Sequence, residues 1–256
     1  MTSERCKVWV IRVSTETMKN RVNLQPAYVL FSQPFQNTSL MVDFFTLEYG
    51  RIRAIAKGAR REKSKFRSLL QPFHPLLLSF IGRGEVRTVS NVESGLGAFR
   101  LEGERLFSGL YLNEILCRLL QNQGEHQSLY QVYRDTLVVL QGSGNVEIIL
   151  RKFELNLLSE LGYAIDLNWD CVSREPIQKD KCYRFAPDAG FELENFSESP
   201  NQADYLFDGC DIIALREFSF AKKKVARSAK RLLRLALSVH LGDKPLRSRD
   251  LFLNPS

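Results

Sequence analysis

Residues 40–58 read LMVDFFTLEYGRIRAIAKG, and this stretch decides the architecture of the first part of the chain. Two runs of β-branched, aromatic and other apolar residues, 40–45 and 51–57, flank a short turn that contains Gly50. Such runs are typical of β-strands, and glycine adopts the positive φ that a tight hairpin turn needs. The stretch therefore predicts an antiparallel β-hairpin.

Segments on either side of this hairpin have the same short period. They are 27–31, 75–81 and 85–89. Turn residues separate the five segments at spacings of roughly 8–12 residues, as in small all-β units. Five strands between residues 26 and 92 predict a small closed barrel, because closure removes the exposed edges that a lone sheet would leave.

From about residue 101 the apolar period becomes helical. Helices are expected near 103–121, 126–140, 148–161 and 222–241. Gly162 and Gly242 follow the third and the last of these helices and are placed to end them. The apolar faces are wider than a coiled-coil seam, so the helices should pack as a globular bundle.

The predicted class is therefore α+β, with a barrel followed by a helical bundle. Residues 1–24 have no clear period and are expected to form a poorly ordered extension. The barrel domain is assigned to 25–98 and the helical domain to 99–256. The latter includes segment 163–211, which is expected to be irregular and carries 11 acidic and 4 basic residues.

The overall composition is that of an ordinary globular protein. The chain has 256 residues, of which 44% are hydrophobic and 25% charged, and this excludes disorder for most of its length. No apolar run of about 18 residues and no signal-peptide core is present, so no membrane partner is expected. Five cysteines at irregular spacing indicate reduced thiols in a cytoplasmic protein.

The positive charge is concentrated in two segments. The formal net charge is +7, but segment 48–70 carries +6 and segment 216–234 carries +7, which leaves −6 for the rest. In the first segment, Arg51 and Arg53 share one strand face, beside a loop, 58–65, that is expected to be flexible. Its basic residues are Arg51, Arg53, Lys57, Arg60, Arg61, Lys63, Lys65 and Arg67. A basic strand face beside a basic loop is what a small barrel uses to follow phosphates; the alternative is a solvated loop that only aids solubility.

The second basic segment contains one stripe on a predicted amphipathic helix. Its members are Lys223, Arg227, Lys230, Arg231 and Arg234. This pattern is compatible with DNA, an acidic peptide or an anionic membrane surface, and equally with a bundle helix that has a solvated basic face.

Sequence signatures of catalysis are missing. The chain contains no phosphate-binding loop of the G-x-x-x-x-G-K-[ST] type and no G-x-S-x-G or H-E-x-x-H motif. His74, His126 and His240 are far apart and have no partner pattern. We therefore expect no catalytic residue, no cofactor and no enzyme activity.

Taken together, a series of short motifs resembles the RecO family of bacterial recombination mediators. They are Tyr28–Leu30, Thr38–Leu40, Tyr49–Arg61, Leu70–Phe73, Gly82–Glu85, Gly109–Glu114, Leu150–Glu154, Leu161–Tyr163 and Lys244–Arg249. The resemblance implies an N-terminal five-stranded OB-fold barrel and a helical domain. It also implies binding of single- and double-stranded DNA, annealing of complementary strands, and RecA loading together with RecR.

The resemblance further implies contact with the acidic C-terminal tail of single-strand DNA-binding protein. It assigns DNA binding to the basic barrel residues, and tail binding to Arg151 in the helical domain. Zinc-binding members carry paired C-x-x-C units, whereas this chain has Cys171, Cys182 and Cys210 at long spacings, so we expect no metal. A cytoplasmic, nucleoid-associated protein is expected. The alternative is an adaptor whose basic surfaces mainly bind acidic peptides.

Overall fold

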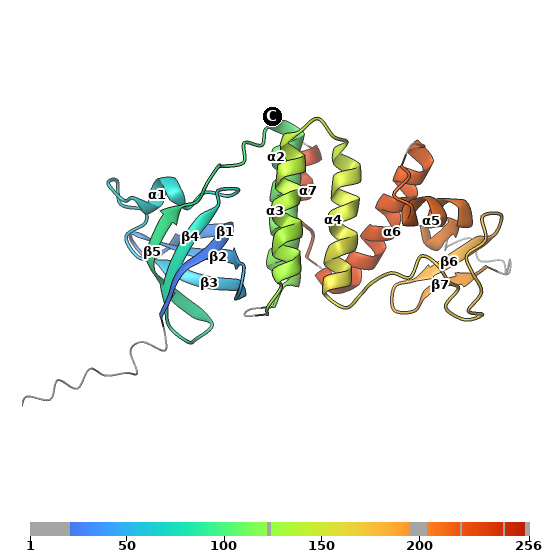
Figure 1. Cartoon of the computed structure of the whole chain (residues 1–256), viewed down its shortest axis with the longest axis horizontal. Helices are drawn as coiled ribbons and strands as arrows, with labels where there is room; N and C mark the ends of the chain where they lie inside the picture. Colours follow the sequence, from blue (N-terminus) through green and yellow to red (C-terminus); the bar gives the residue numbers. More distant parts are fainter. Residues whose placement is uncertain (1–20, 122–123, 195–203, 221, 243, 254–256) are drawn as a thin grey trace, which may run out of the picture.

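The computed structural model describes residues 21–121, 124–194, 204–220, 222–242 and 244–253, and it divides into a barrel and a helical part (Figure 1). Most of the expected N-terminal extension, residues 1–20, lies outside the described residues. Residues 21–24 had been assigned to this extension, but they belong to the first strand of the barrel.

The barrel has the five expected strands and is closed in the order β1-β2-β3-β5-β4. The strands are β1 (Arg21–Phe35), β2 (Ser39–Thr46), β3 (Gly50–Ala56), β4 (Leu76–Ile81) and β5 (Val86–Ser94). A short helix, α1 (Phe66–Leu69), lies between β3 and β4. Only β3 and β5 pair in parallel among these neighbours. The predicted OB-like barrel is confirmed.

The β2–β3 hairpin forms as its sequence predicts. Thr46 pairs with Gly50, which has a φ of +55°, at the turn. Ile52 and Ala54 are buried in the barrel core. Gly50 also meets the helical domain, because a Cβ at this position would lie 1.7 Å from the carbonyl oxygen of Gly124.

The four predicted helices form close to their expected positions. They are α2 (Gly103–Leu119), α3 (Gln127–Gln141), α4 (Val146–Glu160) and α6 (Lys223–Leu241). Two further helices, α5 (Gly209–Arg216) and α7 (Ser248–Leu253), were not predicted. Gly162 and Gly242 follow α4 and α6 with φ values of +84° and +67°, so both helices end as predicted. Among the described residues, none of the helices has the length and apolar character needed to cross a membrane.

The prediction of an irregular segment 163–211 holds for residues 163–181, which contain no helix or named strand, but is wrong for the residues that follow. This part of the chain contributes a three-stranded antiparallel sheet in the order β7-β6-β8, beside α5 and α6 (Figure 1). The strands are β6 (Cys182–Ala186), β7 (Gly190–Leu193) and β8 (Leu206–Asp208). Phe185, Phe191 and Phe207 form an aromatic cluster that joins the buried face of α6 in one core.

The barrel and the helices share a second buried core. Tyr28 of β1 and Phe45 of β2 pack against Tyr130 and Tyr133 of α3 in tilted and edge-to-face arrangements, with ring centroids 5.2–6.0 Å apart. Asn113 of α2 donates to the carbonyl oxygens of Val29 and Leu30 and accepts from the hydroxyl of Tyr133 at 2.6 Å. The outer face of β1 and β2 is therefore covered by helices.

The C-terminal segment is fixed to α2 by polar contacts. Arg118 donates to the carbonyl oxygens of Lys244 and Pro245. The carboxylate of Glu114 accepts from the backbone N–H groups of Arg247 and Ser248 and from the Ser248 hydroxyl. Burial opposes the charge of Glu114, but these hydrogen bonds outweigh it and hold the pKa of this carboxyl below its ordinary value.

Candidate nucleic-acid interface

The connection from β3 into the first residues of α1, residues 57–67, is called the basic loop here. It lies on the side of the barrel away from the helices (Figure 1). Ala59 is fully buried in the barrel core, and the backbone N–H of Arg60 donates to the carbonyl oxygen of Thr38 at 2.8 Å. Further backbone bonds join Arg61 to Gly58 and Ser64 to Arg61. The predicted loop is a series of turns that backbone hydrogen bonds attach to the barrel.

All six cations of the basic loop are exposed. They are Lys57, Arg60, Arg61, Lys63, Lys65 and Arg67. Within the loop, Glu62 is the single carboxylate that opposes them. Arg60 also reaches the carbonyl oxygens of Gln36 and Asn37, in the β1–β2 connection, at 3.4–3.5 Å. Lys65 donates to the side-chain oxygen of Asn91 on β5 at 2.8 Å.

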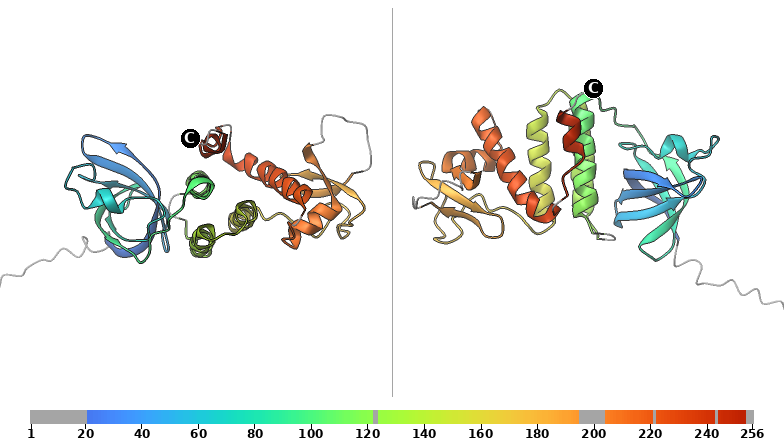
Figure 2. Two further views of the ribbon diagram at one scale, coloured as in Figure 1. Left: turned by 90° about the horizontal axis from the view of Figure 1, so that it is seen from above. Right: turned by 180° about the vertical axis from the view of Figure 1, so that it is seen from behind.

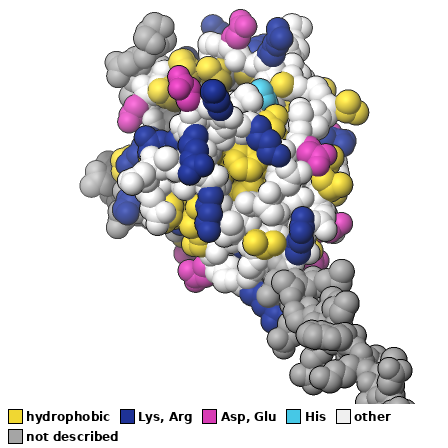
Figure 3. All heavy atoms as spheres, turned by 90° about the vertical axis from the view of Figure 1, so that its left-hand side faces the viewer, with side chains coloured by type: hydrophobic (Ala, Val, Ile, Leu, Met, Phe, Trp, Pro, Cys, Tyr) yellow, Lys and Arg dark blue, Asp and Glu magenta, His cyan; other side chains and the backbone are white. Residues whose placement is uncertain are grey.

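The end of the barrel is visibly basic. Figure 3 shows this end of the molecule, where Lys and Arg side chains surround a small apolar area and the Asp and Glu side chains lie mostly toward the rim. Such a surface attracts polyanions, and its exposed lysines and arginines are free to exchange water for phosphate oxygens.

Arg51 and Arg53 have a different environment from the basic loop. Both lie on the outer face of β3, as predicted, but both donate to Asp43 of β2. Arg51 also donates to the carbonyl oxygen of Leu120, beyond the end of α2, at 3.0 Å. The exposed fractions of the Arg51, Arg53 and Asp43 side chains are 13%, 37% and 6%. Arg51 therefore belongs to the contact with the helical domain, whereas Arg53 is paired with Asp43 within the barrel.

An arginine that the sequence analysis did not single out lies within the barrel. Arg87 of β5 is buried, and its guanidinium lies 4.8 Å from the ring centroid of Phe80 and 5.6 Å from that of Tyr49. Burial lowers the pKa of Arg87. Its cation stacks on the aromatic rings that fill this end of the barrel and is not part of the exposed basic surface.

Arg151, expected to bind an acidic tail, lies inside the helical domain. It is 7% exposed and forms an ion pair of 2.7 Å with Glu154, which also accepts from the Tyr111 hydroxyl. The next residue, Lys152, is exposed, and its ammonium group lies 5.3 Å from the ring centroid of Phe218. The ring of Phe218 is 43% exposed, so an accessible cation and an accessible aromatic side chain lie together here.

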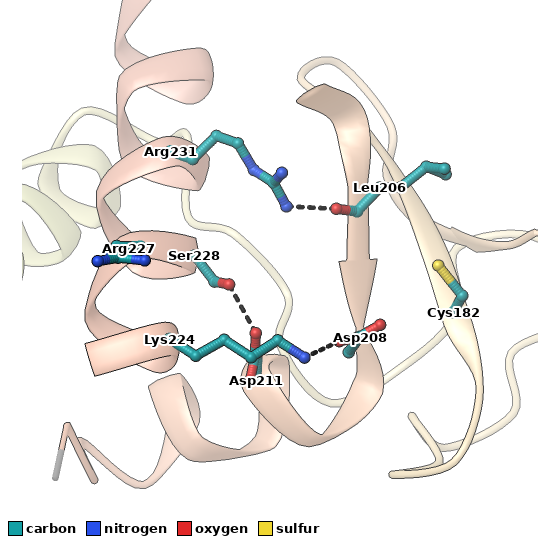
Figure 4. Close-up of a pocket in the computed structure, with 8 residues that line it drawn as sticks. All are labelled: Cys182, Leu206, Asp208, Asp211, Lys224, Arg227, Ser228 and Arg231. Carbon is teal, nitrogen blue, oxygen red and sulfur yellow. Dashed lines mark hydrogen bonds and ion pairs between the residues drawn. The ribbon is translucent and has the colours of Figure 1, made fainter. Parts of the chain in front are cut away.

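Two cations of α6 contact the small sheet. Figure 4 shows the pocket between α6, β6 and β8, in which Lys224 pairs with Asp208 and Arg231 donates to the carbonyl oxygen of Leu206. The hydroxyl of Ser228 donates to Asp211 at 2.6 Å. These partners give Lys224 and Arg231 structural roles.

The three cysteines considered as metal ligands do not form a cluster. Cys182 is on β6 and Cys210 is at the start of α5, whereas Cys171 lies beside Gly190, the first residue of β7. In the described part of the chain, no group of three or more His, Cys, Asp and Glu side chains is arranged to hold a metal ion.

The fold defines the chain as an OB-like barrel protein with a helical second domain. Two family models match it: residues 18–95 match the N-terminal domain of recombination protein O, and residues 100–250 match its C-terminal domain. The chain belongs to the RecO family of DNA repair proteins.

Three relatives illustrate the similarity, and each is named DNA repair protein RecO. The protein of Coxiella burnetii (strain RSA 331) is 40% identical over 91% of this chain and 99% of its own length. The protein of Pseudomonas putida is 45% identical over 89% of this chain and 96% of its own length. The protein of Yersinia enterocolitica is 42% identical over 89% of this chain and 93% of its own length. The resemblance found in the sequence is thereby confirmed over both domains.

Proposed function

We propose that this protein is a non-enzymatic recombination mediator that binds single- and double-stranded DNA with the basic loop and anneals complementary strands. The proposal includes cooperation with RecR and single-strand DNA-binding protein in the loading of RecA. The observation that carries it is the set of six exposed cations on a loop attached to the barrel. Small barrels of this kind follow a nucleic-acid backbone with such loops.

The structure changes which residues of the original set are proposed to contact DNA. Arg51 and Arg53 are assigned a structural role, because their guanidinium groups are held by Asp43. The proposed contacts are Lys57, Arg60, Arg61, Lys63, Lys65 and Arg67. Phosphate contacts of this kind carry no base information, so binding should depend little on sequence.

The test is a charge reversal that leaves the fold untouched. In the barrel-loop variant, Lys57, Arg61 and Lys63 are changed to Glu, since these side chains form no hydrogen bond with other residues that the structure describes. The control variant changes Arg100, Arg134 and Lys179 to Glu, which are also exposed and alter the net charge equally. We expect the barrel-loop variant to lose at least tenfold in single-strand affinity and to anneal slowly, whereas the control stays near wild type. Equal losses in both variants would contradict the proposal.

The acidic tail of single-strand DNA-binding protein is proposed to bind beside α4, at Lys152 and Phe218. Arg151 would not contact the tail itself. Its ion pair with Glu154 would hold the buried side of α4 in place behind this site. A carboxylate can pair with Lys152 while an apolar residue of the tail contacts Phe218. We expect Lys152→Glu to weaken binding of a tail peptide without changing single-strand affinity.

The adaptor alternative is separated from DNA binding by the same peptide. If the basic surfaces mainly bind acidic peptides, the tail peptide should compete with DNA for the basic loop. Under the proposal above, the peptide occupies the Lys152 site and leaves DNA on the barrel.

A further inference from the structure

The stripe of four exposed cations on α6 has no part in the DNA contact proposed for the barrel. Lys223, Arg227, Lys230 and Arg234 are spaced by three or four residues, so they lie along one side of the helix. At 1.5 Å per residue the stripe is about 16 Å long, enough to run beside several phosphates of one strand.

Few carboxylates neutralise the stripe. Lys230 lies 3.7 Å from Glu147 of α4, and both of these side chains are more than half exposed. Among the described residues, no carboxylate lies within ion-pair distance of Lys223, Arg227 or Arg234. The neighbouring Lys224 is paired with Asp208 and does not add to the unpaired charge.

The opposite side of α6 decides between the ligands that a basic amphipathic helix can bind. Its apolar residues are buried in the core of the helical domain. They are Val225, Ala229, Leu232, Leu233, Ala236 and Leu237. A membrane-surface helix must insert such a face into lipid, so this ligand is excluded. What the helix exposes is a row of cations at repeated spacing, which is complementary to a chain of phosphates.

The stripe is far from the basic loop. The barrel and α6 lie on opposite sides of the layer formed by α2, α3 and α4 (Figures 1 and 2). One strand bound along the barrel end therefore leaves the stripe open to another segment of nucleic acid.

We propose that the α6 stripe is a second nucleic-acid contact, and that one molecule holds two separate segments of nucleic acid through phosphates on opposite sides of its helical layer. The inference rests on the proposed function, because it assumes that the first segment binds to the barrel. It adds that the barrel binds one segment while α6 binds another segment on the opposite side of the helical layer.

The experiment uses the full chain and two short oligonucleotides of non-complementary sequence, one labelled with a donor and the other with an acceptor dye. Each is about as long as one barrel covers, roughly 4–16 nucleotides. The stripe variant changes Lys223, Arg227 and Arg234 to Glu, and a second variant changes them to Gln. The control variant again changes Arg100, Arg134 and Lys179 to Glu. Energy transfer reports two oligonucleotides on one complex, and its mass shows whether the complex contains one protein chain.

Wild type and control are expected to bind both oligonucleotides on a single chain. The Glu variant should keep one of them and weaken the second by about tenfold or more, with a smaller loss for the Gln variant. The barrel-loop variant should lose the first and keep the second. If wild type binds one oligonucleotide only, or if the stripe variants still bind two, the second contact is wrong while the proposed function stands. If wild type binds none, the proposed function itself fails. Stripe variants that lose binding of an acidic peptide but keep both oligonucleotides would also overturn the proposed second contact on α6.

Discussion

The carboxylate of Asp43 on β2 holds the guanidinium of Arg53 on β3 through two hydrogen bonds of 3.0 and 3.1 Å. This hydrogen bond is the main reason why the pKa of Arg53 is raised. The same carboxylate accepts from Arg51, whose second nitrogen reaches the helical domain. Arg51 thus joins the barrel to the helical domain, while Arg53 is paired with Asp43 within the barrel. The proposed DNA contacts are therefore the cations of the basic loop.

Removal of the Asp43 carboxylate should therefore destabilise the protein. In Asp43→Ala, Arg51 keeps a mostly buried position without its anionic partner, and we expect a loss of about 3 kcal/mol in the free energy of unfolding. Urea denaturation measures it, with Lys57→Ala as the matched exposed control. A loss below about 1 kcal/mol would show that the arginines do not depend on Asp43.

Asp170 should make stability depend on pH in the acidic range. Burial opposes its charge, but backbone N–H groups of Val172, Ser173 and Leu193 donate to its carboxylate, and the pKa of Asp170 is lowered. Because the folded pKa lies below the unfolded value of about 3.9, the stabilising effect is complete above that value and is lost as pH falls through the folded pKa.

The variant Asp170→Asn tests this expectation. It should unfold more easily than wild type at pH 7, by about 1–2 kcal/mol, and the difference should shrink below about pH 4. Thermal unfolding at a series of pH values checks it. A difference that stays constant down to pH 2–3 would contradict the role of the carboxylate charge.

The cysteines should differ in reactivity. Burial raises the pKa of the Cys117 thiol to about 12, so very little of it is thiolate at pH 8, whereas Cys210 is exposed. In a Cys6→Ser background, a thiol reagent should label Cys210 within the native protein and Cys117 only after unfolding. Mass spectrometry of the labelled peptides checks the order, and equal labelling rates would contradict it.

Strand alternation and glycine positions predict much of this fold. Ile52 and Ala54 face the barrel core because the hairpin has a strict period of two, and Gly162 ends α4 because it adopts a left-handed conformation. The same alternation places Arg51 on the outer face. Strand alternation does not show which part of the outer face another domain covers. For that reason Arg51 was predicted to be available to DNA.

Other features depend on contacts between distant segments. The small sheet was missed because its strands have three to five residues, too few for a period to emerge. Lys152 and Phe218 are 66 positions apart and meet only through packing, so no local pattern predicts their contact. The basic composition of the loop was visible in the sequence, whereas its attachment depends on the burial of Ala59.

The basic loop is proposed to bind single strands through phosphates, and salt titration tests this binding most directly. The affinity of wild type and of the barrel-loop variant for one oligonucleotide is measured across a series of salt concentrations. Each lost phosphate contact lowers the slope of log affinity against log salt by about 0.7 for a single strand, so three lost contacts should lower it by about 2. The control variant should keep the wild-type slope. An unchanged slope in the barrel-loop variant would contradict the account.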